Sequence, residues 1–210
     1  MFLENLADFL VERRRSGDAE QALKHITRCL ELGEGLLRNN HDSALDMRLV
    51  SMDLIKLADL LILRGQPGDA EQAFKHYSRS LDLAIALLKR SPSSLEALRD
   101  VSWSREKLAD YLVLRGQAGD ARQALEYYTD DLECLERLIE ANPGSAQAAQ
   151  DLVLCHLKFA DFAARTGDKS GAEKHRRACY DILQSRVSAG MFFNSTTMNI
   201  YRELYETFGK

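Results

Sequence analysis

The chain has 210 residues, of which 45% are apolar and 29% are charged. This balance can fill a core and argues against disorder, while the formal net charge of −4 disfavours a nucleic-acid partner, because phosphate binding needs a concentrated basic surface. No run of about 18 apolar residues occurs and the first residues lack a small-residue cleavage site, so we expect neither a membrane-spanning helix nor a secretory signal.

The sequence repeats with a period of 51 residues. LADLLILRGQPGDAEQAF and LADYLVLRGQAGDARQAL are the clearest copies, and Asp8, Asp59, Asp110 and Asp161 keep the register at 51-residue intervals. Repeats of about 20–50 residues indicate a solenoid. We therefore predict one all-helical array over residues 1–210, an α-solenoid of antiparallel helix pairs, with repeats at about 1–41, 42–92, 93–143 and 144–188 and a C-terminal cap at 189–210.

Each repeat is predicted to contain two helices. The first helix of the first copy covers residues 1–14, and its second copy begins near Asp42 or Ser43, both of which are good N-caps. The second helix covers residues 18–38, with small apolar residues at its start and larger ones after them. This gradient predicts a tilted helical hairpin, in which the two helices approach closely at one end.

The predicted breaks between helices recur as regularly as the helices. Gly65-Gln66-Pro67-Gly68 and its copy at 116–119 end one helix, and Asp69 or Asp120 opens the next. Pro92 and Pro143 stop the second helix of their pairs.

The fourth copy begins with a helix at 146–165 and then becomes polar at His175 and Arg176. Terminal repeats commonly become polar on the face that has no next neighbour. A last helix, capped by Asn194 or Ser195 and ending near Phe208, is predicted to cover the open end of the stack, because an uncovered apolar stripe would aggregate. Its apolar side consists of Thr197, Ile200, Tyr201, Leu204, Tyr205 and Phe208.

The third copy resembles a tetratricopeptide repeat. Leu108-Ala109, Leu112, Gly116, Ala121 and Leu125 have spacings similar to those of that family, whose usual unit is about 34 residues of paired helices. The resemblance extends to about Leu183 and implies paired helices, a right-handed superhelix and a concave groove that binds a partner. It also implies a regulatory part of a larger bacterial signalling protein.

We find no motif for catalysis, a cofactor or a metal. No glycine-rich phosphate loop, HExxH motif or nucleophile elbow occurs, so we expect the chain not to be an enzyme. The four cysteines have no CxxC spacing, which predicts reduced thiols in a cytoplasmic protein. An enzyme built from scattered His and Asp residues is the least favoured alternative.

One charged pattern recurs in the first helices: Lys56 with Asp59, Lys107 with Asp110, and Lys158 with Asp161. Residues i and i+3 are neighbours on a helix, so the pattern predicts ion pairs within each helix. The family resemblance implies another role, in which a lysine at the position of Lys107 holds the terminal carboxylate of a partner. An aspartate three residues later would repel that carboxylate and favours the self-paired charges.

These observations favour a non-catalytic scaffold that binds a peptide or helix of a partner protein on the concave face. Trp103 is the best single contact candidate, because tryptophan is enriched at binding hot spots. The alternative is a structural module that forms homo-oligomers through exposed apolar residues such as Phe2, Leu3 and Phe9. The predicted partner-binding residues are Met52, Ile55, Lys56, Asp59, Ile62, Trp103, Lys107, Asp110, Val113, Leu154, Lys158 and Asp161.

Overall fold

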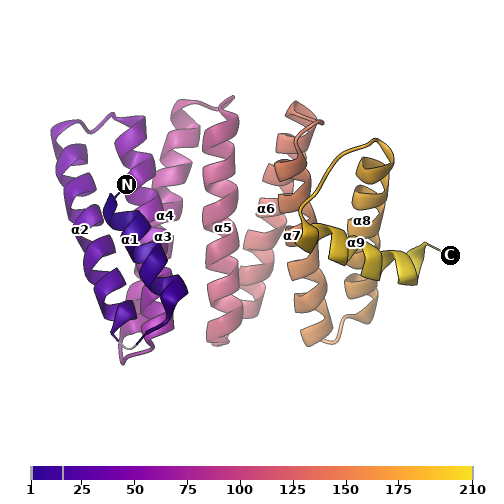
Figure 1. Ribbon diagram of the computed structural model, residues 1–210, viewed down its shortest axis with the longest axis horizontal. Coiled ribbons are helices and arrows are strands. Elements are labelled where there is room, and N and C mark those ends of the chain that lie inside the picture. The colour runs from indigo at the N-terminus through magenta and orange to yellow at the C-terminus, as the bar shows by residue number, and fades with distance from the viewer. Residues whose placement is uncertain (1, 16, 210) are drawn as a thin grey trace. The chain divides into compact units, whose positions relative to one another are not determined.

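The computed structural model describes residues 2–15 and 17–209, and all regular secondary structure in these ranges is α-helical. None of the helices in these ranges is both long and apolar enough to cross a membrane. Figure 1 shows consecutive helices packed as antiparallel pairs in residues 2–39, 44–90 and 146–188. The helices are α1 (Phe2–Arg13), α2 (Asp18–Asn39), α3 (Ala44–Arg64), α4 (Asp69–Arg90), α5 (Leu95–Arg115), α6 (Asp120–Ala141), α7 (Ala146–Arg165), α8 (Lys169–Ser188) and α9 (Ser195–Phe208).

The helix boundaries confirm the 51-residue spacing through the first three repeats. The helices α2, α4 and α6 begin at Asp18, Asp69 and Asp120, each preceded by a glycine with a positive φ, such as Gly68 at 87°. The hydroxyl of Ser43 caps α3 by accepting a hydrogen bond of 3.1 Å from the backbone N–H of Asp46. Local sequence chemistry therefore sets where these helices start.

An arginine at the end of the first helix binds the aspartate that opens the second helix. Arg64 donates from Nε and Nη2 to the two carboxylate oxygens of Asp69 at 2.9 and 2.5 Å, and Arg13 binds Asp18 in the same way at 3.0 and 2.6 Å. The pKa of the Asp18 carboxyl is lowered to about 2, chiefly by the hydrogen bonds from Arg13. The two planar forks clamp the turn between the helices of a pair.

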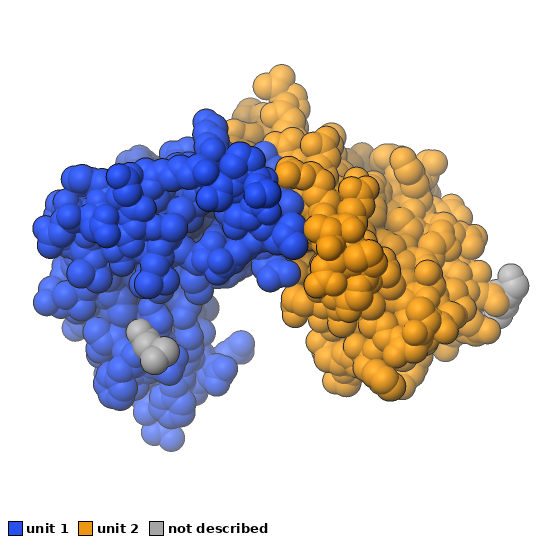
Figure 2. Space-filling model, turned by 90° about the horizontal axis from the view of Figure 1, so that it is seen from above, with its two compact units in different colours: residues 1–115 blue, residues 116–210 orange. Residues whose placement is uncertain are grey.

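The chain divides into two compact units, Met1–Arg115 and Gly116–Lys210, which Figure 2 shows in blue and orange. The boundary lies in the turn after α5, inside the third predicted repeat. Unit 1 contains α1 to α5, and its helix pairs pack through small residues early in the second helices, where Ala22 and Ala73 are fully buried. The expectation that residues 1–210 form one array stays a prediction.

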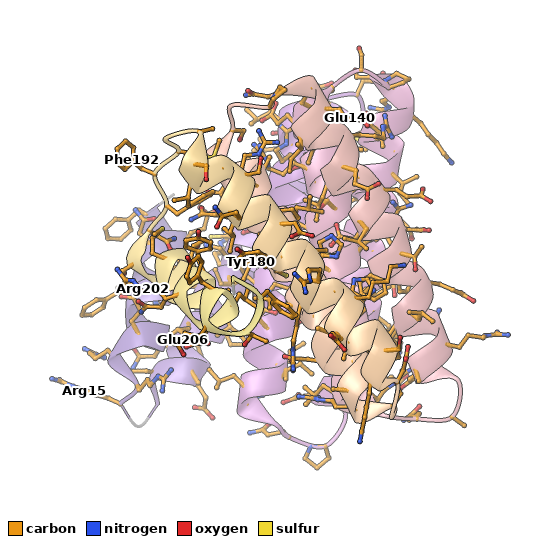
Figure 3. All side chains as sticks on the ribbon, turned by 90° about the vertical axis from the view of Figure 1, so that its right-hand side faces the viewer. Arg15, Glu140, Tyr180, Phe192, Arg202 and Glu206 are labelled. Atoms are coloured by element: carbon orange, nitrogen blue, oxygen red, sulfur yellow. The ribbon has the colours of Figure 1, made fainter. Side chains whose placement is uncertain are left out.

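Unit 2 contains α6 to α9, and α9 packs against α8. Leu204 of α9 lies in a core cluster with Val153, Cys179 and Leu183, which confirms that the last helix covers an apolar face. Figure 3 shows this end of the molecule, with Tyr180 of α8 close to α9 and Phe192 pointing away from the loop between these helices. Asn194 caps α9 by accepting a hydrogen bond from Thr197 N.

Candidate functional site

Two open pockets lie between the first helices of successive repeats in unit 1. The α1–α3 pocket has a volume of about 380 Å³, and the α3–α5 pocket has a volume of about 190 Å³. Ligand pockets commonly have volumes of about 300–1,000 Å³, so only the first has the size of a typical ligand site. The α1–α3 pocket is lined by Ala7, Asp8, Val11, Glu12, Ile26, Lys56, Asp59, Leu60 and Leu63, and the α3–α5 pocket by Asp59, Ile62, Tyr77, Lys107, Asp110, Tyr111 and Leu114.

The two pockets are the same site in successive repeats. Every residue that lines the α3–α5 pocket has a counterpart 51 positions earlier in the lining of the α1–α3 pocket. The counterparts are identical at the charged positions, where Asp8 and Lys56 correspond to Asp59 and Lys107. A site that recurs with the repeat can engage an extended partner at two points.

The pockets differ at the floor. Ile26 and Leu60 in the α1–α3 pocket are replaced by Tyr77 and Tyr111 in the α3–α5 pocket. The Tyr77 hydroxyl donates to Asp59 at 2.5 Å, and the centres of the two tyrosine rings are 5.7 Å apart. Burial, followed by the Asp59 carboxylate, raises the pKa of the Tyr77 phenol, so the ring stays neutral. The pocket with the two tyrosines has the smaller volume.

The lysines pair between repeats, and the prediction of pairing within one helix is wrong for Lys56 and Lys107. Lys56 Nζ lies 2.9 and 3.1 Å from the carboxylate oxygens of Asp8, and Lys107 Nζ lies 2.7 Å from Asp59 Oδ2. The lysine side chain crosses to the preceding first helix, because α1, α3 and α5 lie next to one another in the order of the repeats. Both lysines thus hold neighbouring repeats together at the mouths of the pockets.

The predicted binding residues of unit 1 gather mainly at these pockets. Lys56, Asp59, Ile62, Lys107 and Asp110 line them. The exceptions include half-buried Trp103 and Val113, which line neither pocket, and Met52, which is 37% exposed.

Ile55 requires a correction. Its side chain is only 1% exposed, so it belongs to the core and cannot contact a partner in this structure. The hydrophobic pattern misplaced it because the long first helices pack on both neighbouring repeats, which buries more than one stripe of each helix.

The predicted residues of unit 2 lie on α7. Leu154 is 46% exposed, Lys158 is half-buried, and Asp161 is exposed with its Oδ1 4.0 Å from Arg176 Nη2 of α8. Five further pocket residues were not among the residues predicted from the sequence: Asp8, Val11, Leu63, Tyr77 and Tyr111. Shifting the predicted residues by one repeat period would have found Asp8 and Val11, the counterparts of Asp59 and Ile62.

A separate, partly buried polar cluster lies between the first three helices of unit 1. Glu4, Cys29 and Asp53, from α1, α2 and α3, place one ligand atom each within 4.8 Å of one another, a group that could hold a metal ion. Asp53 is only 3% exposed, and burial, followed by the charge of Glu4, raises the pKa of its carboxyl to about 7. In the next repeat, the positions of Cys29 and Asp53 are occupied by Ser80 and Ser104, whose neutral hydroxyls are 3.1 Å apart.

A histidine pair joins α7 to α8 in unit 2. The Nδ1 atoms of His156 and His175 are 2.9 Å apart, and the His175 ring stacks on Phe159 with ring centres separated by 4.5 Å. Burial, followed by the charge of His175, lowers the pKa of His156 to about 4. The pair is therefore neutral near pH 7, with one ring donating to the other.

No protein-family model and no curated protein sequence matches the chain. Solved helical repeat structures do match it. The de novo designed helical repeat protein DHR64 has 17% identity and a TM-score of 0.52, with 97% of this chain and 95% of that chain covered. The DHF58 filament has 16% identity and a TM-score of 0.51, with 98% and 93% covered. BtubC (BKLC) from P. vanneervenii has 15% identity and a TM-score of 0.42, with 91% and 84% covered. The chain thus has the fold of helical repeat proteins, all-α and built from consecutive helix pairs.

Proposed function

We propose that the chain is a non-catalytic scaffold that binds a peptide or helix of a partner protein on the face formed by α1, α3 and α5. The observation that supports this function is the recurrence of one pocket, with the same lysine and aspartate positions, in two successive repeats. Paired pockets of this kind suit a ligand that has its own repeat, such as side chains at regular intervals along a peptide. The face offers an apolar floor in the α1–α3 pocket, an aromatic floor in the α3–α5 pocket, and charged residues at both mouths that can orient a ligand.

The finer assignment that we propose is a tetratricopeptide-like repeat with unusually long helices, acting in the bacterial cytoplasm. The similarity in the third repeat and the long, paired helices support it. All four cysteines lie in the described ranges and are free thiols, which suits a reducing compartment.

The test is capture of partners from a native extract by the full chain and by two charge-reversed variants. Lys107→Glu places a carboxylate beside Asp59 at the α3–α5 pocket, whereas Lys75→Glu reverses a lysine that is 68% exposed on α4. A partner of this face is lost with Lys107→Glu and retained with Lys75→Glu. Partners that bind both variants and the Trp103→Ala variant equally would contradict the proposed face.

Self-association is a second candidate, and one contrast between repeats supports it. Leu36 of α2 is 55% exposed, whereas its counterpart Leu87 is 4% exposed. Leu87 packs with Met47 of α3 and Ala97 of α5, whereas the exposed Leu36 offers an apolar contact at the matching position of α2. The DHF58 neighbour is a filament by its name, which suits association of copies through such an exposed position.

Light scattering over a range of protein concentrations tests this second candidate. If α2 forms a contact between copies, the mass rises with concentration, and Leu36→Lys restores the monomer. Thr27→Lys on the exposed part of the same helix is the matched control. A monomer at all concentrations would exclude the self-associating module.

A further inference from the structure

The α1–α3 pocket has lysine and aspartate at the same repeat positions as the α3–α5 pocket, but its floor contains no tyrosine. Tyr77 of α4 occupies the floor of the α3–α5 pocket at 4% exposure and donates its hydroxyl to Asp59. In the α1–α3 pocket the corresponding positions are Ile26, which has no donor, and Asp8. The α3–α5 pocket therefore shows that a phenol hydroxyl fits against the aspartate at this position of the repeat.

We propose that the α1–α3 pocket binds a tyrosine side chain of the partner protein. The phenol ring packs on Ile26 and Leu60, and its hydroxyl donates to the Asp8 carboxylate as Tyr77 donates to Asp59. This inference rests on the proposed scaffold function, because the ligand is a side chain of the bound partner.

The size of the pocket supports an aromatic ligand. Its volume of about 380 Å³ is twice the 190 Å³ of the pocket that the chain fills with two tyrosines. The floor residues Ile26 and Leu60 are 1% and 6% exposed, so they form a fixed apolar surface. A planar ring gains contact area on such a surface with few rotatable bonds to immobilise.

The charges at the mouth favour a phenol over a plain phenyl ring or an anion. The Asp8 side chain is 56% exposed and is bound by Lys56 Nζ, which leaves carboxylate lone pairs for a further donor. In the α3–α5 pocket, Asp59 accepts from both Lys107 and Tyr77, so one carboxylate accommodates both donors. Asp8 and Glu12 at the mouth would repel a carboxylate or phosphate ligand.

The direct test uses p-cresol, the side-chain analogue of tyrosine, with toluene as its counterpart without the hydroxyl. Methyl NMR spectra of the full chain should show p-cresol shifting Val11, Leu60 and Leu63, with affinity at least threefold higher than that of toluene. Asp8→Ala should remove this preference, and Asp82→Ala on the exposed face of α4 is the control. Equal affinity for the two compounds, or shifts confined to other methyl groups, would overturn the inference.

Two variants that close the pocket make the test independent of one substitution. Ile26→Tyr places the native residue of the α3–α5 pocket on the floor, and Leu63→Glu adds a charge at a mouth residue that is 60% exposed, so it leaves the core intact. Each should weaken p-cresol binding at least tenfold. Retention of binding by a folded Leu63→Glu protein would contradict the proposed site.

Selection of binders from a random peptide library separates this inference from the scaffold function. Selected peptides that require a tyrosine and lose binding to Leu63→Glu support both proposals. Peptides that bind through other residues and bind Leu63→Glu equally contradict the tyrosine pocket and leave the scaffold function in place. Failure to select any peptide, with p-cresol still bound, contradicts the scaffold function and retains the phenol site.

Discussion

Lys107 of α5 donates to Asp59 of α3 at 2.7 Å, although 48 residues separate them in the sequence. Asp59 also accepts from Tyr77 of α4, so one carboxylate joins three helices. The same arrangement one repeat earlier joins Lys56 to Asp8. These contacts make the mouth of each pocket a junction between repeats.

The first prediction concerns this ion pair. A double-mutant cycle with Lys107→Met and Asp59→Asn should give a coupling free energy of about 0.2–1 kcal/mol, the usual range for a solvent-accessible ion pair. The same cycle with Lys56→Met and Asp59→Asn should give a coupling near zero, because Lys56 pairs with Asp8. Urea unfolding followed by the fluorescence of Trp103 measures both cycles. A larger coupling for Lys56 with Asp59 than for Lys107 with Asp59 would support pairing within the helix instead.

The second prediction concerns the fork between Arg64 and Asp69. Arg64→Lys keeps the charge but removes the bidentate geometry, so the melting temperature should fall by a few degrees. Arg79→Lys is the control, because Arg79 makes an exposed contact with Glu34. Equal melting temperatures for the two variants would show that the fork does not stabilise the turn.

The third prediction concerns the pH dependence of unit 1. The Asp53 carboxyl has a pKa of about 7 in the folded chain against an ordinary 3.8, so the folded state binds the extra proton between these values. Stability should therefore fall as pH rises from about 4 to 7. Asp53→Asn removes the ionisable group while keeping a donor for Glu4. The change that it causes in the free energy of unfolding should be more favourable at pH 8 than at pH 5, by on the order of 2 kcal/mol.

Trp103 fluorescence during urea unfolding at pH 5 and pH 8 measures this difference, with Asp82→Asn as the exposed control. If Asp53→Asn changed the free energy of unfolding by the same amount at both pH values, the claim that Asp53 holds a proton in the folded state would be wrong. Titration with Zn²⁺ on the same samples shows whether Glu4, Cys29 and Asp53 bind a metal.

The fourth prediction has the opposite sign and concerns unit 2. The pKa of His156 is lowered from 6.5 to about 4, so the unfolded state binds the extra proton between these values and stability should rise with pH from about 4 to 6.5. His156→Gln should reduce this slope, with a change on the order of 2 kcal/mol across the window. Hydrogen exchange of the α7 and α8 amides at pH 4.5 and 7 measures it, and the ring resonances of His156 report the pKa directly. A titration midpoint of His156 near 6.5 would contradict this assignment.

The sequence by itself determined the helices, their caps and their period. Ser43, Gly68 and Asp69 act on the backbone next to them, and local chemistry of this kind is readable without a partner helix. The same period located the pocket residues Lys56, Asp59 and Lys107, because equal positions in equal repeats fall on equal faces. The apolar stripe of the last helix predicted that α9 covers an apolar face, because such a stripe would aggregate if it were left uncovered.

Only the tertiary structure decided which residues meet across repeats. Helix geometry alone fixes the distance between Lys56 and Asp59, which lie on the same helix. The distance from Lys56 to Asp8 depends instead on how α1 packs against α3. The burial of Ile55 and the difference in volume between the two pockets have the same origin, since both follow from the side chains that neighbouring helices contribute. Contacts between residues about 50 positions apart depend on how the helices pack against one another. The repeat period alone does not give the distance between two such side chains.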